Sequence, residues 1–339
     1  MEKKKLFNFA CGNPPYMENT DSQSTRMPPI YNVFMDEVYK IAEKTELITP
    51  ARFLFNAGYT PKEWNEKMLK DPHFKVLHYE PDSSKVFPDA EIKGGVAITY
   101  RDSTKEFGAI GTFTKYEELN TILKKVMSIA YQYLDSIISS PLNYTLSSLM
   151  KAENPNLLDR LRTSAFTNLA AIFYEEKPTD GHEYVSMIGL LKNKRVSRYV
   201  RRDYLKDGNG VIDKYNLLVS KANGSGYFGE TLSQAVVAAP GTAYTQTFIG
   251  IGAFKTKMEV ENTEKYIKTK FARAMLGVLK ITQDCPGPKW KYVPLQDFTE
   301  GSDIDWSKSI TEIDAQLYRK YGLTIDEINF IEENVKEME

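Results

Sequence analysis

Cysteine and histidine are scarce in this sequence. The 339 residues include two cysteines, Cys11 and Cys285, and three histidines, His73, His78 and His182. Two distant cysteines do not make a disulfide framework, and no spacing of these residues matches a zinc site. We therefore expect no metal site and a reducing, cytoplasmic environment.

Long hydrophobic runs and an excess of one charge are missing as well. No window approaches the ~18 apolar residues of a membrane span, and the apolar run after the basic start MEKKK is shorter than the ~7–15 residues of a secretion signal. We expect no membrane partner. The formal net charge is −1, so binding to nucleic acid would have to come from a local cluster of cations.

The first part of the sequence, about 1–110, alternates strand and helix patterns. Strand patterns occupy KLFNFA, ELITPARFL as far as Pro50, FKVLHYE and GGVAITYRD. The stretch TPKEWNEKMLKD predicts a helix with Thr60 as its N-cap. Another amphipathic helix is predicted over PPIYNVFMDEVYKIAEKT, with an apolar stripe of Ile30, Val33, Phe34, Val38 and Ile41. The alternation predicts an α/β layer with largely parallel strands, in which KLFNFA is a buried strand.

The pattern changes near residue 116. Residues 116–139 read as one long helix, residues 184–250 hold short strand-like runs separated by turn residues, and the last section is helical. Thr324 is expected to cap the last helix, whose apolar stripe would be Ile325, Ile328 and Ile331. These patterns predict a mixed α+β region with a helical C-terminus.

The stretch CGNPPYMENT places a rigid polar corner directly after the first strand pattern. Consecutive prolines remove backbone donors and fix φ, so the preceding carbonyl groups point outward as acceptors. With the amide of Asn13, they could hold an exocyclic amino group while the ring of Tyr16 stacks on the heterocycle. The alternative is a turn that ends the strand, because Asn-Pro and Pro-Pro are common turn signals.

The corner also carries a resemblance to a known family. NFACGNPPYM resembles the catalytic motif of the amino-methylating DNA methyltransferases, adenine-N6 branch. The stretches IYNVFMDEVYKIA, ELITPARFL, KVFPDAEIKGGVAITYRD and VSKANGSGYFGE, and the C-terminal YIKTKFARAMLGVLKITQD, strengthen it. Together they resemble the restriction–modification methylases in which a methyltransferase half is followed by a target-recognition region.

This resemblance implies an enzyme that acts on an adenine rotated out of the DNA duplex. Asn13 and the Pro14 carbonyl would accept from the adenine amino group, Pro15 would stiffen the corner, and Tyr16 would stack on the base. The cofactor implied is S-adenosylmethionine, flanked by Phe9 or Ala10. The transfer implied is direct and needs no metal, so positioning supplies most of the rate.

The sequence departs from the family where the cofactor should bind. The twelve residues before Asn13 hold no Gly-x-Gly turn and no carboxylate placed for a ribose. The one later candidate, FIGIGAF at 248–254, reads better as a strand with close backbone approach. We expect either that a second chain supplies the cofactor-binding lobe or that the gene product is truncated and cannot methylate alone. A third alternative is that only DNA recognition remains.

A second candidate site is a cationic window, LLKNKRVSRYVRRDYLKDG. It contains Lys192, Lys194, Arg195, Arg198, Arg201, Arg202 and Lys206. Such a cluster could contact phosphates and read guanine edges, and the alternative is a solvated strand face. The following KANGSGYFGE adds Lys221 and Asn223 as expected DNA contacts on a glycine-rich loop, with a hairpin turn as the alternative.

The sequence therefore predicts an α/β fold, with a partial Rossmann-like methyltransferase lobe at 1–115. A DNA target-recognition region at 116–290 and a helical segment at 291–339 would follow. The predicted function is site-specific adenine-N6 methylation of double-stranded DNA in restriction–modification, with a protein partner carrying the cofactor-binding lobe. The alternative is a non-catalytic DNA-specificity or interaction protein derived from such a methylase.

Overall fold

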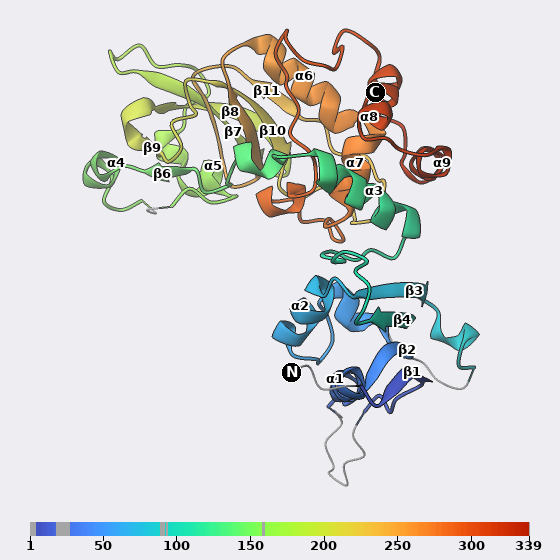
Figure 1. Ribbon diagram of the computed structural model, residues 1–339. Coiled ribbons are helices and arrows are strands. Elements are labelled where there is room, and N and C mark those ends of the chain that lie inside the picture. Colours follow the sequence, from blue (N-terminus) through green and yellow to red (C-terminus); the bar gives the residue numbers. More distant parts are fainter. Residues whose placement is uncertain (1–4, 18–27, 89–91, 93, 158–159, 339) are drawn as a thin grey trace. The chain divides into compact units, whose positions relative to one another are not determined.

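A computed structural model of the protein describes residues 5–17, 28–88, 92, 94–157 and 160–338 (Figure 1). The chain divides into two compact units, residues 1–120 and 121–339.

Unit 1 is built around a four-stranded sheet with the order β1-β2-β4-β3. The strands and helices are β1 (Phe7–Gly12), α1 (Tyr31–Ile41), β2 (Ala42–Pro50), α2 (Lys62–Lys70), β3 (Phe74–Glu80) and β4 (Val96–Asp102). β1 and β2 are parallel, whereas β4 is antiparallel to both β2 and β3. The expectation of largely parallel strands is therefore wrong. The segment between β3 and β4 holds only the short 3₁₀ helix Ser83–Lys85 among its described residues, and a parallel pair would require a long crossover connection.

The helix α2 begins one residue later than predicted, with Pro61 rather than Thr60 at its N-cap. The hydroxyl of Thr60 donates instead to Oδ1 of Asn65, at 2.6 Å. The predicted helix is otherwise confirmed, as are the strands at β3 and β4.

The core of unit 1 lies on one face of its sheet. Its helical members include Tyr31 and Met35 from α1 and Trp64 and Met68 from α2, which pack with Leu47, Phe74 and Ala97 of the strands and with Phe53. This packing reverses the predicted orientation of α1. Its buried residues are Tyr31, Asn32 and Met35, whereas Val33, Phe34 and Ile41 of the predicted apolar stripe are exposed.

The strand β1 is not buried either. Phe7 and Phe9 are exposed by 54% and 50%, because β1 is the outermost strand of the sheet and β2 is its one partner among the described residues. The predicted strand exists, and its predicted burial is wrong.

Unit 2 contains three further sheets, with the orders β11-β10-β13-β5, β12-β7-β8 and β6-β9. Their strands are β5 (Ile138–Ser139), β6 (Tyr144–Leu146), β7 (Tyr184–Leu191), β8 (Lys194–Arg201), β9 (Leu205–Asp207), β10 (Tyr215–Ser220), β11 (Val236–Ala238), β12 (Thr242–Tyr244) and β13 (Phe248–Phe254). The expected strands within 184–250 are confirmed. A buried cluster that includes Met187, Val200, Leu218 and Phe248 joins the first two of these sheets.

The helices of the second half are shorter than their patterns suggested. They are α3 (Glu117–Ile129), α4 (Ser148–Glu153), α5 (Ala165–Asn168), α6 (Lys257–Lys268), α7 (Lys270–Gly277), α8 (Ile310–Lys320) and α9 (Ile325–Asn334). The single helix expected over 116–139 ends at Ile129, because Leu134 and its neighbours form a 3₁₀ turn that leads into β5.

The capping prediction at the C-terminus is confirmed, since Thr324 caps α9 in a capping box with Glu327. The predicted stripe is partly wrong. Ile331 is buried, but Ile325 is exposed, and Phe330 is buried instead, with its ring 5.6 Å from that of Phe228.

Candidate functional site

The Asn-Pro-Pro-Tyr corner begins at the carboxyl end of β1. Asn13 follows Gly12 directly, and its side chain is exposed. No hydrogen bond joins that side chain to another residue in the part of the chain that the structure describes. Since β1 and β2 are parallel, their carboxyl ends share one edge of the sheet, which is where open α/β sheets bind ligands. The amide of Asn13 is therefore available to a ligand at such an edge.

Tyr16 is held more firmly than Asn13. Its ring packs edge-on against Phe87, with ring centres 6.4 Å apart, and its hydroxyl lies 3.5 Å from the carbonyl oxygen of Ile48. Its carbonyl accepts from the backbone N–H of Ile30, at the start of α1. Burial raises the pKa of its hydroxyl to about 12. Tyr16 is thus a fixed, neutral, half-buried ring next to the corner.

The two residues expected to flank the cofactor lie on opposite faces of β1. Successive strand residues point to opposite sides, and Phe9 is aligned with Lys44 while Ala10 is aligned with Thr45, which is buried. Phe9 lies on the open face of the sheet, and Ala10 on the face that carries the helices. A pocket on one face of the sheet could be lined by only one of them. Which of Phe9 and Ala10 flanks the cofactor stays a prediction.

The glycines of FIGIGAF do not form a cofactor loop. They belong to β13, a strand paired on both sides with β10 and β5. A Cβ at Gly250 would come within 3.0 Å of the ring of Tyr244, and Gly252 has φ +111 and faces the ring of Phe254. The strand interpretation is confirmed. This stretch therefore does not supply the glycine-rich turn of a cofactor site.

The cationic window begins at the end of β7 and runs through β8 and a 3₁₀ turn into β9. β7 and β8 form a hairpin. Its turn is Lys192–Asn193, with φ of 50° and 62°, and Leu191 pairs with Lys194 across it. A two-residue turn with both φ angles positive is the hairpin turn whose twist matches that of the strands. Lys192 and Lys194 are exposed at its tip, and no ion pair of either is found within the described residues.

The arginines of the same window are largely engaged in ion pairs. The pairs are Arg198–Glu175 (2.6 Å), Arg201–Glu153 (2.9 Å), Arg201–Asp203 (2.6 Å) and Arg202–Asp213 (2.5 Å). Arg195 instead lies over the ring of Phe248 and donates to the carbonyl oxygen of Gln234. Within the described residues, the cations of this window without an ion pair are Lys192 and Lys194 at the turn, Arg195, and the exposed Lys206 of β9.

The two predicted DNA contacts in the loop after β10 differ in exposure. Lys221 is exposed, but Asn223 is only 2% exposed. The amide of Asn223 donates to the carbonyl oxygen of Ser220 and accepts from the backbone N–H of Ser233 at 2.7 Å. Asn223 thus ties the loop together, and a direct contact with DNA would require the loop to open.

Glu230 organises this loop and was missed from the sequence. Its carboxylate accepts from the backbone N–H groups of Ser225 (2.7 Å) and Gly226 (2.9 Å) and forms an ion pair with the buried Lys280. Burial acts to raise the pKa of Glu230, but these hydrogen bonds outweigh it and lower the pKa to about 2. The only sequence signal was an acidic residue after a glycine-rich turn. The partner Lys280 lies fifty positions away, so local sequence could not reveal the ion pair.

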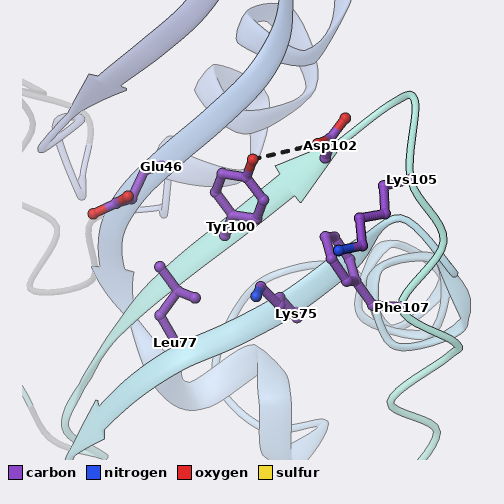
Figure 2. A pocket seen from close by; sticks show the side chains of 7 residues that line it. All are labelled: Glu46, Lys75, Leu77, Tyr100, Asp102, Lys105 and Phe107. Atoms are coloured by element: carbon purple, nitrogen blue, oxygen red, sulfur yellow. Dashed lines mark hydrogen bonds between the residues drawn. The ribbon is translucent and has the colours of Figure 1, made fainter.

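A shallow depression of about 310 Å³ lies on the open face of the sheet of unit 1. Figure 2 shows Glu46 from β2, Tyr100 from β4, and Lys75 and Leu77 from β3 on this face. Lys75 Nζ is 4.7 Å from the centre of the Phe107 ring, and Asp102 and Lys105 complete the lining. Hydrogen bonds from the side chain and backbone of Thr104 lower the pKa of Asp102. The depression is thus lined by acidic, basic and aromatic side chains.

The described residues contain neither a helix suited to span a membrane nor a cluster of metal-ligating side chains. None of their helices has the length and apolarity to cross a membrane. None of their His, Cys, Asp and Glu side chains gather in a group of three or more that could hold a metal ion.

Comparison with known proteins bears on the first unit. Residues 1–87 match the family model of the Eco57I restriction-modification methylases. This match contains the whole Asn-Pro-Pro-Tyr corner and supports a methyltransferase-related function for the chain. It covers about a quarter of the sequence.

One solved structure is similar over most of the chain. It is the type IIG restriction endonuclease BpuSI, with 9% identity and a TM-score of 0.35 over 90% of this chain. The match covers 48% of BpuSI, so the chain spans about half the length of that protein. No curated protein matches the chain.

Proposed function

We propose that this protein is part of a site-specific DNA adenine-N6 methyltransferase of a restriction–modification system, with S-adenosylmethionine as the methyl donor. The observation that carries the proposal is Asn13, which is exposed at the carboxyl end of a strand parallel to its neighbour and is followed by two prolines. The methylase family match over residues 1–87 includes this position.

The share of the reaction assigned to this chain is to bind and orient the base. The Asn13 side-chain oxygen and the Pro14 carbonyl accept from the exocyclic amino group of an adenine rotated out of the duplex. Pro15 prevents the corner from relaxing, since its φ is fixed. Tyr16, already anchored against Phe87, offers an aromatic surface beside the base.

Recognition of the DNA is proposed for unit 2 through the β7–β8 hairpin. Lys192 and Lys194 at the tip provide charge that the protein does not itself neutralise within the described residues, and the loop lysine Lys221 is exposed in the same unit. Contacts of this kind bind phosphates and confer salt-dependent affinity. Arg195, Arg198, Arg201 and Arg202 would then mainly support the hairpin.

A second candidate function is that of a non-catalytic DNA-specificity protein. It is favoured by one observation, namely that FIGIGAF, the one stretch considered for the cofactor turn, is a strand paired on both sides. The two functions differ in methyl transfer and agree in DNA binding.

The deciding experiment measures transfer of labelled methyl groups from S-adenosylmethionine to duplex DNA, with the chain alone and with the product of the neighbouring gene. We expect Asn13→Ala to reduce transfer by roughly 100-fold, as loss of one preorganised polar contact typically does. Folding should be unaffected because Asn13 is exposed.

Tyr131→Ala is the matched control, since Tyr131 is 97% exposed and lies outside the corner. Full transfer by Asn13→Ala would overturn the assigned role of the corner. Duplex binding without any methyl transfer, in both mixtures, would favour the non-catalytic alternative.

A further inference from the structure

We infer that Tyr227 in unit 2 is a base-stacking residue, which the loop 224–229 presents to a DNA base whose face is not covered by a neighbouring base. The inference rests on the proposed function for DNA as the ligand. Three features of the molecule support it: the exposure of the ring, the anchoring of the loop on both sides of Tyr227, and the small size of the apolar surface.

The ring of Tyr227 projects from the surface of unit 2. Tyr227 is 81% exposed, although its neighbours Gly226 and Phe228 are partly buried. A crevice of about 10 Å³ lies beside it, with Glu230 and Lys280 in its lining. This is roughly the space that one water molecule needs, so the ring cannot fold back into the protein. It therefore stays available to a ligand.

The segment that leads to the exposed tyrosine is fixed by hydrogen bonds. The N–H of Asn223 donates to the carbonyl oxygen of Gln283 at 2.8 Å. The N–H groups of Ser225 and Gly226 donate to the carboxylate of Glu230. The backbone before the tyrosine is thus held both by a neighbouring segment and by a side chain of the loop itself.

The residues that follow the exposed tyrosine are packed into unit 2. The ring centre of Phe228 lies 5.6 Å from that of Phe330 in α9. The carbonyl oxygen of Gly229 accepts from the N–H of Lys336 at 2.9 Å and from Nη1 of Arg273, which is 3% exposed, at 3.5 Å. A loop that is fixed on both sides requires little further ordering when it binds a ligand.

The apolar surface around Tyr227 has the size of a base rather than that of a protein interface. The adjacent segment contributes Ile281, which is 73% exposed and precedes Thr282, whose backbone lies against Gly226. A tyrosine buries about 150–250 Å², far less than the ~800 Å² that each partner contributes to a stable protein complex. Every nucleobase has a flat face on which an aromatic ring can stack. The surface therefore fits a single base better than another folded protein.

The same loop places a cation along the chain from the ring. Lys221, proposed above as a phosphate contact, is exposed, and its carbonyl oxygen accepts from the N–H of Cys285 at 2.7 Å. Sites for unpaired bases combine a cation on the backbone with an aromatic ring on the base. Asp284 of the neighbouring segment is exposed as well and offsets the charge of Lys221. We therefore expect the contact at Tyr227 to be one of stacking rather than of charge.

The ligand is an unstacked base, because the neighbours of a base in a regular duplex cover both of its faces. Rotation of an adenine out of the duplex, as proposed for this protein, removes one base from the stack and leaves its partner unpaired. Bases freed in this way offer the face that Tyr227 can contact. We therefore expect a preference for DNA that contains an unpaired base.

Fluorescence anisotropy with the full chain tests this contact. The probes are a duplex with one unpaired thymine at its centre and the same duplex fully paired, and we expect tighter binding to the first. Tyr227→Ala should weaken binding to the first probe by about 5- to 150-fold, the loss expected for one base stack, whereas Tyr227→Phe should retain it. Because the contact carries no charge, Tyr227→Ala should leave the slope of log K against log salt unchanged.

A second measurement reports the base itself. The unpaired thymine is replaced by 2-aminopurine, whose fluorescence falls when an aromatic ring stacks on it. The wild type and Tyr227→Phe should quench this fluorescence, and Tyr227→Ala should not. Tyr131→Ala is the matched control, because Tyr131 is 97% exposed in the same unit and lies outside the loop. It should behave as the wild type, and all variants should keep the wild-type melting temperature.

Four results would overturn the contact at Tyr227. They are wild-type binding and quenching by Tyr227→Ala, a loss of both by Tyr227→Phe, failure of the wild type to bind either duplex, and self-association of the chain that Tyr227→Ala abolishes. Methyl transfer that depends on Asn13, together with unchanged binding by Tyr227→Ala, would leave the proposed function standing. Ring-dependent binding without methyl transfer, alone or with the product of the neighbouring gene, would overturn the methyltransferase function and leave the contact at Tyr227 standing.

Discussion

At the residue scale, Glu230 shows how one carboxylate holds a loop. It accepts from the backbone of Ser225 and Gly226 and pairs with Lys280, whose side chain is only 4% exposed. Gly226 has φ +97, and a Cβ there would come 2.5 Å from the backbone of Thr282. The glycine is therefore required by the close approach of two chain segments, which Glu230 stabilises by bonding to the loop.

Replacement of Glu230 should change both stability and its pH dependence. The pKa of Glu230 is lowered from the ordinary 4.5 to about 2. Its stabilising contribution is thus fully present above pH 4.5 and is lost as the pH falls from about 4.5 to about 2. Glu230→Gln should lower the free energy of unfolding at pH 7 by roughly 3 kcal/mol, because Lys280 loses its partner.

Urea unfolding at a series of pH values measures this effect. The wild type should lose more stability than Glu230→Gln over the acidic window. The matched control is Glu261→Gln, which removes an exposed pair with Lys257 and should cost under about 1 kcal/mol. Parallel pH curves for the wild type and Glu230→Gln would contradict the role given to the carboxylate.

The corner and the loop also show what can be predicted at this scale. Asn13 and Asn223 were both singled out because an asparagine stands in a turn-forming stretch. Asn13 is exposed. The side-chain amide of Asn223 instead donates a hydrogen bond to the carbonyl oxygen of Ser220 and accepts one from the backbone N–H of Ser233. Ser233 lies ten residues further along the chain, so local sequence could not reveal this bond.

At the element scale, the β7–β8 hairpin contains arginines that form ion pairs and turn lysines that do not, although the sequence does not distinguish them. Arg201 has a side chain only 12% exposed and pairs with Glu153 and Asp203. Its replacement would break these pairs and destabilise the hairpin, so weakened DNA binding would not identify a DNA contact. The exposed lysines of the turn give a cleaner test.

We expect Lys194→Glu to weaken duplex binding without changing the melting temperature. If Lys194 contacts one phosphate, the slope of log K against log salt should decrease in magnitude by about 1. Fluorescence anisotropy with labelled duplex at several salt concentrations measures both quantities. Lys124→Glu makes the same charge change on the exposed side of α3 and should have little effect. An unchanged slope for Lys194→Glu would remove the turn from the DNA interface.

At the scale of the whole molecule, the two units have separate cores. Phe53, which is fully buried, belongs to the core of unit 1, and Leu218 belongs to the buried cluster of unit 2. The two clusters share no residue. Independent cores usually unfold in separate cooperative transitions.

Calorimetry should therefore resolve two unfolding transitions, each sensitive to one core. Phe53→Ala and Leu218→Ala should each destabilise their own unit by about 2–5 kcal/mol, since each leaves a cavity. Each variant should lower the midpoint of one transition and leave the other in place. A single transition, shifted equally by both variants, would show that the units unfold as one.

The sequence by itself determined the local features of this protein. It indicated the strand at β1, the corner that follows, the strands within 184–250, and the N-cap at Thr324. These features depend on residue periodicity, on the fixed φ of proline and on hydrogen bonds between near neighbours, all of which lie within a few positions of one another.

Tertiary structure alone decided the direction of β4, the exposed edge at β1, the orientation of α1 and the pairing of the arginines. β4 is antiparallel to β2, and its partners lie about fifty positions earlier in the chain. An apolar stripe such as that of α1 shows that a helix needs a partner, but not whether the same chain provides it. That depends on which elements meet in space, and in this protein the stripe remains exposed.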